Sequence, residues 1–176
     1  MLKGYWDAAM TLEQFIAEAK QNQELWQQYY RRATVPDEIV ERLRDLPGPR
    51  YLLVIAEDWC GDAFNTVPYV ARLAEAVPQF ELRVVRRDEN PELMDRYLTG
   101  TSRAIPVVIV MDEEFRELGW WGSRPKELQT WFLSDEAQAM PKEDRYREMR
   151  RWYARDRGRS ALSEIAELLE KTAVGV

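Results

Sequence analysis

The chain has 176 residues, of which 45% are apolar, and this is enough for one compact domain with a hydrophobic core. Its formal net charge of −6 argues against general nucleic-acid binding, because a phosphate backbone attracts a basic surface and repels an acidic one. No apolar run approaches the roughly 20 residues that span a bilayer, and residues 1–10 lack the apolar core of a signal peptide. We therefore expect a cytoplasmic protein that binds neither nucleic acid nor a membrane.

Histidine is absent from the sequence, and Cys60 is its single cysteine. The lack of histidine excludes Ser–His and Cys–His catalytic pairs and imidazole metal ligands. With one thiol, the chain cannot form an internal disulfide, a multi-cysteine zinc site or an iron–sulfur cluster ligated within one molecule. We expect no metal and no cofactor, and any redox reaction requires a second molecule.

Residues 1–35 are predicted to form an N-terminal helical extension. Thr11 has Gln14 three residues later, which is the capping-box spacing, and apolar residues follow at helical spacing as far as Tyr29. A further helix is predicted to begin at Pro36 and to end before Pro47, since Pro47-Gly48-Pro49 stops it.

Strands and helices alternate in the next segment, 36–134. Short apolar runs predict strands at 51–56, 80–85, 106–111 and 115–121, of which the last two form a hairpin. Apolar residues at helical spacing predict helices at 62–77, at 91–98 and from Pro125 onward. This order predicts an α/β fold, a three-layer α/β/α sandwich with a mixed four-stranded sheet.

Residues 135–176 are predicted to form a C-terminal helical extension packed on the core. Gly158 separates two predicted helices, at 141–156 and 160–172. Between residues 141 and 159 the chain carries eight basic and four acidic side chains, a net charge of +4. An acidic partner or a phosphate group could bind there, and a solvated helix face accounts for the same pattern.

The buried strand at 51–56 leads through Glu57-Asp58 into Trp59-Cys60-Gly61 and then directly into a helix. Pro68 lies eight residues after Cys60, and Ile105-Pro106 heads the third strand. This combination resembles the thioredoxin-like superfamily, in which the active-site cysteine stands at a strand-to-helix junction. The resemblance covers residues 36–133 and implies a thioredoxin-like fold with a single-cysteine WCGDA active-site motif and a cis-proline at Pro106.

Two residues of a thioredoxin dithiol site are missing from the sequence. Where that family has the second cysteine of Cys-x-x-Cys, this chain has Ala63, and where it has a buried acid six residues before the first cysteine, this chain has Val54. A mixed disulfide on Cys60 therefore cannot be released from within the chain.

The thiol of Cys60 is expected to be more acidic than that of a free cysteine. A helix N-terminus offers free N–H groups and the positive end of the dipole, which favour a thiolate. Asp58 and Asp62 oppose this effect by their negative charge, so the expected lowering of the pKa is small. The alternative is that Cys60 is an inert core residue.

The residues around Cys60 allow both functional and structural interpretations. Trp59 either docks a partner or packs. Asp62 either tunes the thiol or touches a thiol ligand, or it is a helix-capping or first-turn acid. A cis bond between Ile105 and Pro106 would offer a strand-like backbone edge to a bound peptide or small thiol, or would simply form a tight turn. The predicted site comprises Trp59, Cys60, Gly61, Asp62, Ala63, Ile105 and Pro106.

Monothiol chemistry is the leading functional hypothesis: Cys60 exchanges with a protein disulfide or a low-molecular-weight thiol, and an external thiol resolves the adduct. The chain is similar to monothiol glutaredoxins in this logic only, because it lacks their Cys-Gly-Phe-Ser signature. The alternatives are a redox-silent module that binds a protein partner and a cysteine-based oxidation sensor. Val54 and Ala63 favour these alternatives over rapid turnover.

Overall fold

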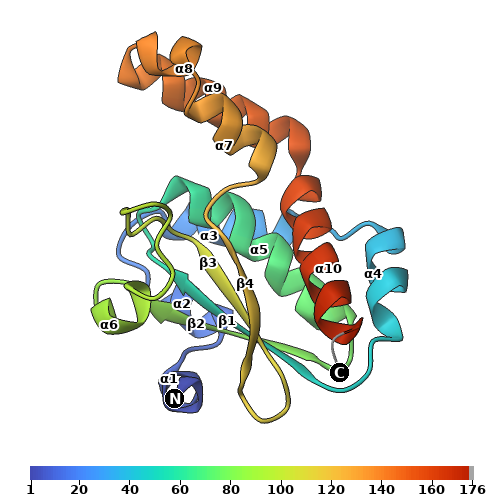
Figure 1. The fold of residues 1–176 in the computed structure, drawn as a ribbon. Coiled ribbons are helices and arrows are strands. Elements are labelled where there is room, and N and C mark those ends of the chain that lie inside the picture. The colour runs from blue at the N-terminus through green and yellow to red at the C-terminus, as the bar shows by residue number, and fades with distance from the viewer. Residues whose placement is uncertain (175–176) are drawn as a thin grey trace.

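The computed structural model describes residues 1–174, which form a mixed four-stranded sheet flanked by helices (Figure 1). The strands are β1 (Arg50–Ala56), β2 (Phe80–Arg86), β3 (Val107–Met111) and β4 (Glu117–Gly122). They lie in the order β2-β1-β3-β4, with β1 parallel to β2 and antiparallel to β3, and with β3 antiparallel to β4. The α/β fold class predicted from the sequence is confirmed.

Helices precede, connect and follow the strands (Figure 1). They are α1 (Leu2–Ala8), α2 (Leu12–Ala17), α3 (Gln23–Arg32), α4 (Asp37–Arg44), α5 (Gly61–Ala76), α6 (Pro91–Met94), α7 (Lys126–Phe132), α8 (Asp135–Ala139), α9 (Lys142–Asp156) and α10 (Arg159–Val174). The apolar pattern does not predict α1 and α8, because a helix of one to two turns presents too few apolar positions to show a period.

The pattern from Thr11 to Tyr29 predicts one helix, whereas the structure has α2 and α3. Asn22 separates them with a left-handed backbone, φ 57°. The side-chain amide of Gln23 donates to the carbonyl groups of Ile16 and Ala17, which lie at the end of α2. The last carbonyl groups of a helix lack their usual partners four residues on, and the Ile16 carbonyl accepts instead from the backbone N–H of Ala19, so the Gln23 side chain stabilises the break.

The two faces of the sheet are covered by different helices, because alternate residues of a strand point to opposite sides. On one side, Trp6 of α1 packs against Tyr51 of β1 with 5.0 Å between the ring centroids. On the other side, α10 approaches β4 so closely that a Cβ atom on Gly119 would lie 2.7 Å from Leu168. Helix α5 packs beside α10 on this second side (Figure 1).

The N-terminal and C-terminal helices share the hydrophobic core of the sheet, which runs from Leu2 to Leu169. A second apolar cluster joins Leu128 of α7 to Met149 and Tyr153 of α9. Helices α7, α8 and α9 project from the rest of the molecule (Figure 1), and we call them the arm. None of the helices within residues 1–174 combines the length and the apolar composition that a bilayer-spanning segment needs.

Candidate functional site

Cys60 occupies the N-cap position of α5, in the turn that follows β1. The residue is 8% exposed. Its S–H group donates a hydrogen bond to the carbonyl oxygen of Ile105, 3.6 Å from Sγ. The Ile105–Pro106 peptide bond is cis. The fold therefore places the loop before β3 directly against the cysteine, although the two segments are 45 residues apart.

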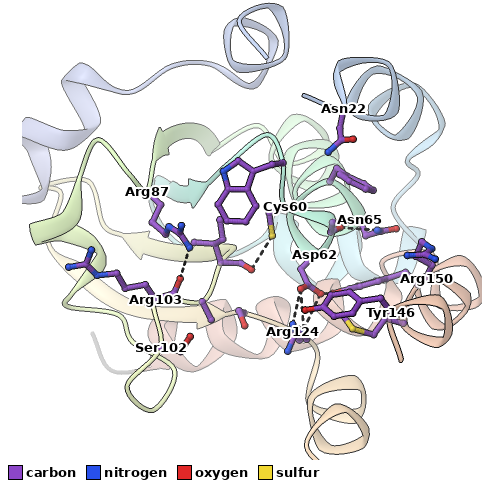
Figure 2. A pocket seen from close by; sticks show the side chains of 18 residues that line it. Asn22, Cys60, Asp62, Asn65, Arg87, Ser102, Arg103, Arg124, Tyr146 and Arg150 are labelled. Atoms are coloured by element: carbon purple, nitrogen blue, oxygen red, sulfur yellow. Dashed lines mark hydrogen bonds and ion pairs between the residues drawn. The ribbon is translucent and has the colours of Figure 1, made fainter. Parts of the chain in front are cut away.

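A pocket of about 550 Å³ opens beside Cys60 (Figure 2). Of the residues predicted for the site, the pocket is lined by Trp59, Cys60, Gly61, Asp62 and Ile105. Ala63 and Pro106 do not line it, because both are buried behind its wall. The arm forms the opposite wall through α9, so the pocket lies between the sheet domain and the arm.

Burial in this wall raises the pKa of Cys60 to about 11, and the negative charge of Asp62 adds to the effect. The backbone N–H groups of Ala63 and Asp62 and the Arg124 guanidinium lower the pKa, but by less. The lowered pKa expected from the sequence is therefore wrong. The N-terminus of α5 favours the thiolate, but burial removes most of the water that would solvate the charged sulfur, and this effect is larger.

Asp62 forms a buried polar cluster with two residues that the sequence did not single out (Figure 2). Its carboxylate accepts hydrogen bonds from Nε of Arg124 at 3.1 Å and from the hydroxyl of Tyr153. The side chains of Asp62 and Arg124 are 11% and 15% exposed. Asp62 lies in the first turn of α5. It ties the cysteine turn to the segment after β4 and to the arm.

Tyr153 and Arg124 are held by apolar as well as polar contacts. Burial, followed by the charge of Asp62, raises the pKa of Tyr153 well above its ordinary value, so the phenol stays a donor. The Arg124 guanidinium lies 4.1 Å from the ring centroid of Phe132 in α7 and donates to Gln129 at 3.0 Å. The cluster is thus a fixed junction between the turn and the arm.

Trp59, immediately before the cysteine, is 41% exposed at the rim of the pocket. The guanidinium of Arg87 lies 4.9 Å from its ring centroid and donates to the carbonyl of Arg103 at 3.1 Å. A large apolar ring left open beside a cysteine is suited to contact with a ligand or partner. This exposure is compatible with a docking role for Trp59, one of its two interpretations from the sequence.

The acidic pair before Trp59 is structural. Asp58 accepts a hydrogen bond from the backbone N–H of Lys20 at 2.9 Å, and its carbonyl accepts one from the indole of Trp26. Glu57 accepts from the backbone N–H of Asp88, and burial raises the pKa of Glu57. Neither residue lines the pocket. Asp58 anchors the N-terminal helical segment to the turn, and Glu57 anchors the segment that follows β2.

Nothing in the sequence pattern points to Arg124 or Tyr153. They lie 62 and 91 residues from Asp62 along the chain, and an isolated arginine or tyrosine carries no motif. The one available signal is the basic segment 141–159, because it contains both Tyr153 and the pocket residue Arg150. Within residues 1–174, no group of three or more cysteine, aspartate or glutamate residues is placed to hold a metal ion.

Comparison with known proteins agrees with the fold. The family Thioredoxin_9, described as thioredoxin, matches residues 9–140 and so includes the N-terminal helices as well as the sheet. No curated protein matches the sequence. A crystal structure of a protein of unknown function, PA1234 from Pseudomonas aeruginosa, is 22% identical, with a TM-score of 0.74 over 94% of both chains. The crystal structure of an HIV 4E10 epitope-scaffold is 20% identical, with a TM-score of 0.72 over 94% of both chains.

Proposed function

Because this chain belongs to the thioredoxin family, whose match covers most of its length, we propose that it works as a ligand-binding member in which Cys60 stays an un-ionised thiol. The observation that carries this proposal is the state of the sulfur. Its S–H group donates a hydrogen bond to the Ile105 carbonyl, and burial raises the pKa of the thiol to about 11. In this proposal the ligand binds in the pocket beside Cys60.

Dithiol chemistry has no chemical basis in this chain. Cys60 is the single cysteine, and the position of a resolving thiol is occupied by the fully buried methyl group of Ala63. Val54, at the position of the buried acid, lies in the centre of the sheet with Val84 and Val108 as its neighbours in register. These two positions therefore supply neither a resolving thiol nor a carboxylate.

Fast thiol chemistry is also disfavoured in the ligand-free state. A thiol with a pKa of about 11 is ionised in roughly one molecule in ten thousand at pH 7, and the thiolate is the reactive form. By contrast, the pocket has the volume of a small-molecule site, for which 300 to 1,000 Å³ is typical by order of magnitude. Binding is therefore the activity that the resting geometry supports best.

Monothiol exchange is the second candidate, and the position of Cys60 in the pocket wall favours it. In this reaction the Cys60 thiolate attacks a disulfide R–S–S–R′ of a protein or a small molecule, forms Cys60–S–S–R and releases R′–S⁻. An external thiolate then attacks the mixed disulfide, restores Cys60 and leaves as a disulfide with R. This route requires the bound partner to lower the pKa of Cys60, with the exposed ring of Trp59 as a docking surface.

The reaction of Cys60 with a small neutral disulfide, bis(2-hydroxyethyl) disulfide, distinguishes the two functions at pH 7. We expect a second-order rate constant well below that of N-acetylcysteine, because a buried thiol of high pKa is a poor nucleophile. Cys60→Ser serves as the blank for reaction elsewhere. A rate constant above that of N-acetylcysteine would overturn the binding proposal in favour of monothiol exchange.

A further inference from the structure

The pocket beside Cys60 is rich in arginine although the whole chain carries a net charge of −6. Among the described residues that line it, Asp62 is the only acid, while Arg87, Arg103, Arg124 and Arg150 are all present. A cavity with an excess of one charge concentrates ligands of the opposite charge. The arginines differ in whether their guanidinium groups can pair with a ligand in the pocket.

Two of the arginines are poorly placed for a ligand. Arg124 is paired with Asp62 inside the pocket, at 3.1 Å, so its charge is compensated there. Arg103 makes a two-pronged contact with the exposed Asp95, at 2.8 and 2.9 Å, and its guanidinium points away from the cavity in Figure 2.

Arg150 and Arg87 remain, on either side of Cys60 (Figure 2). Arg150 is exposed on α9 and forms no ion pair or side-chain hydrogen bond within residues 1–174. Arg87 forms an ion pair through Nε with Asp88, whose side chain is 61% exposed, and donates Nη1 to the Arg103 carbonyl, which leaves part of its five-donor fork for a ligand. Two guanidinium groups thus flank the cysteine, and they are chemically suited to carboxylate or phosphate oxygens.

Ser123 adds a polar group to the pocket. This residue lines the cavity and is 4% exposed, and its hydroxyl makes no hydrogen bond within residues 1–174. The hydroxyl oxygen is not one of the fully buried atoms without a partner, so it is accessible in the pocket and offers a donor and an acceptor to a ligand. The N-terminus of α5, a helix of 16 residues, also begins in this wall and favours negative charge.

We infer that the pocket binds a small anionic molecule, whose carboxylate or phosphate groups pair with Arg150 and Arg87 on the two sides of Cys60. The inference rests on the proposed binding function and adds the chemical class of the ligand. The ligand lies between the sheet domain and the arm, because Arg150 belongs to α9 whereas Arg87 follows β2. Its central part then sits against the thiol and the ring of Trp59.

Two alkylating reagents of nearly equal shape test this inference: the anion iodoacetate and the neutral iodoacetamide. The Cys60 thiolate attacks the CH2 carbon of either reagent and displaces iodide, so the ratio of the two rate constants does not depend on how much of the thiol is ionised. At low ionic strength we expect the ratio, relative to that of N-acetylcysteine, to exceed one. We also expect the iodoacetate rate to saturate with concentration, while the iodoacetamide rate rises linearly.

The variants Arg150→Gln and Arg87→Gln should each lower the ratio about two- to fivefold, the effect expected of one charge acting across a solvated pocket. The matched control is Arg151→Gln, which removes the same charge from the next position of α9. Arg151 does not line the pocket and pairs with Glu148 at 2.6 Å. This control should leave the ratio unchanged.

A ratio equal to that of N-acetylcysteine, or an equal effect of Arg150→Gln and Arg151→Gln, would overturn the anionic ligand class. The proposed function fails by a different result, a fast reaction with the neutral disulfide. Thermal unfolding separates the cases further: stabilisation by succinate but not by neutral succinamide supports the inference. Equal stabilisation by both keeps the binding function and refutes the anionic ligand.

Discussion

Replacing Asp62 by asparagine removes the central acceptor of the junction between the cysteine turn and the arm. The carboxylate accepts from Arg124 and Tyr153, and the Arg124–Asp62 pair is largely buried. An asparagine keeps one oxygen but turns a donor toward a guanidinium that has lost its countercharge. Breaking a fully buried pair costs about 3 to 5 kcal/mol, and the partial exposure of this one reduces the expected loss of unfolding free energy to about 2 to 4 kcal/mol.

The same substitution should change the acidity of the cysteine. The negative charge of Asp62 raises the pKa of Cys60, and the positive charge of Arg124 lowers it. In Asp62→Asn the first effect disappears and the second is no longer balanced, so the pKa of Cys60 falls from about 11. Burial, which is the larger cause, remains, and the pKa stays above that of a free thiol, about 8.5.

Urea unfolding and the pH dependence of iodoacetamide alkylation measure the two effects of Asp62→Asn. Asp95→Asn is the matched control, because Asp95 also pairs with an arginine, Arg103, but at a site where both side chains are 51% exposed. This control should cost less than about 1 kcal/mol. Equal losses in the two variants, or an unchanged alkylation profile in Asp62→Asn, would refute the role of the junction.

Three other outcomes follow from the buried positions near the site. The folded protein holds the pKa of Cys60 at about 11 against an ordinary 9.0, so the unfolded chain loses this proton first as the pH rises. Between these two pH values, the unfolding free energy of the wild type should fall by about 2 to 3 kcal/mol. Urea unfolding measures this fall, which Cys60→Ala should not show. Ala63→Cys should form a reversible disulfide with Cys60, seen as a mass decrease of two hydrogens and the loss of both free thiols on oxidation; persistent free thiols would contradict the geometry of the turn. Gly158→Ala should destabilise by about 2 to 4 kcal/mol, because a Cβ there would lie 2.3 Å from the Tyr69 ring at φ +74°; Gly4→Ala, with no atom within 4 Å of the added methyl, should not.

The sheet and the place of the cysteine could be predicted from local sequence. The runs that became β1 and β3 are almost wholly apolar, and a strand buried on both faces leaves that pattern whatever surrounds it. The edge strand β2 is only partly buried and mixes charged with apolar residues. The strand, the turn at Cys60 and the long helix α5 follow one another within one stretch of chain, so their order is readable directly. The break between α2 and α3 could not be predicted in this way, because it depends on the backbone conformation of Asn22.

The properties of the site could not be predicted, because they depend on groups that are distant in the sequence. The helix N-terminus predicts an acidic thiol, but the pKa of Cys60 is set first by how deeply the surrounding chain buries the sulfur. The partners of Asp62 come from after β4 and from α9, and only the folding of the arm against the sheet domain brings them together. By itself, the sequence determined the fold and the position of one thiol; the tertiary structure decided that this thiol is un-ionised and that Arg87 and Arg150 flank it.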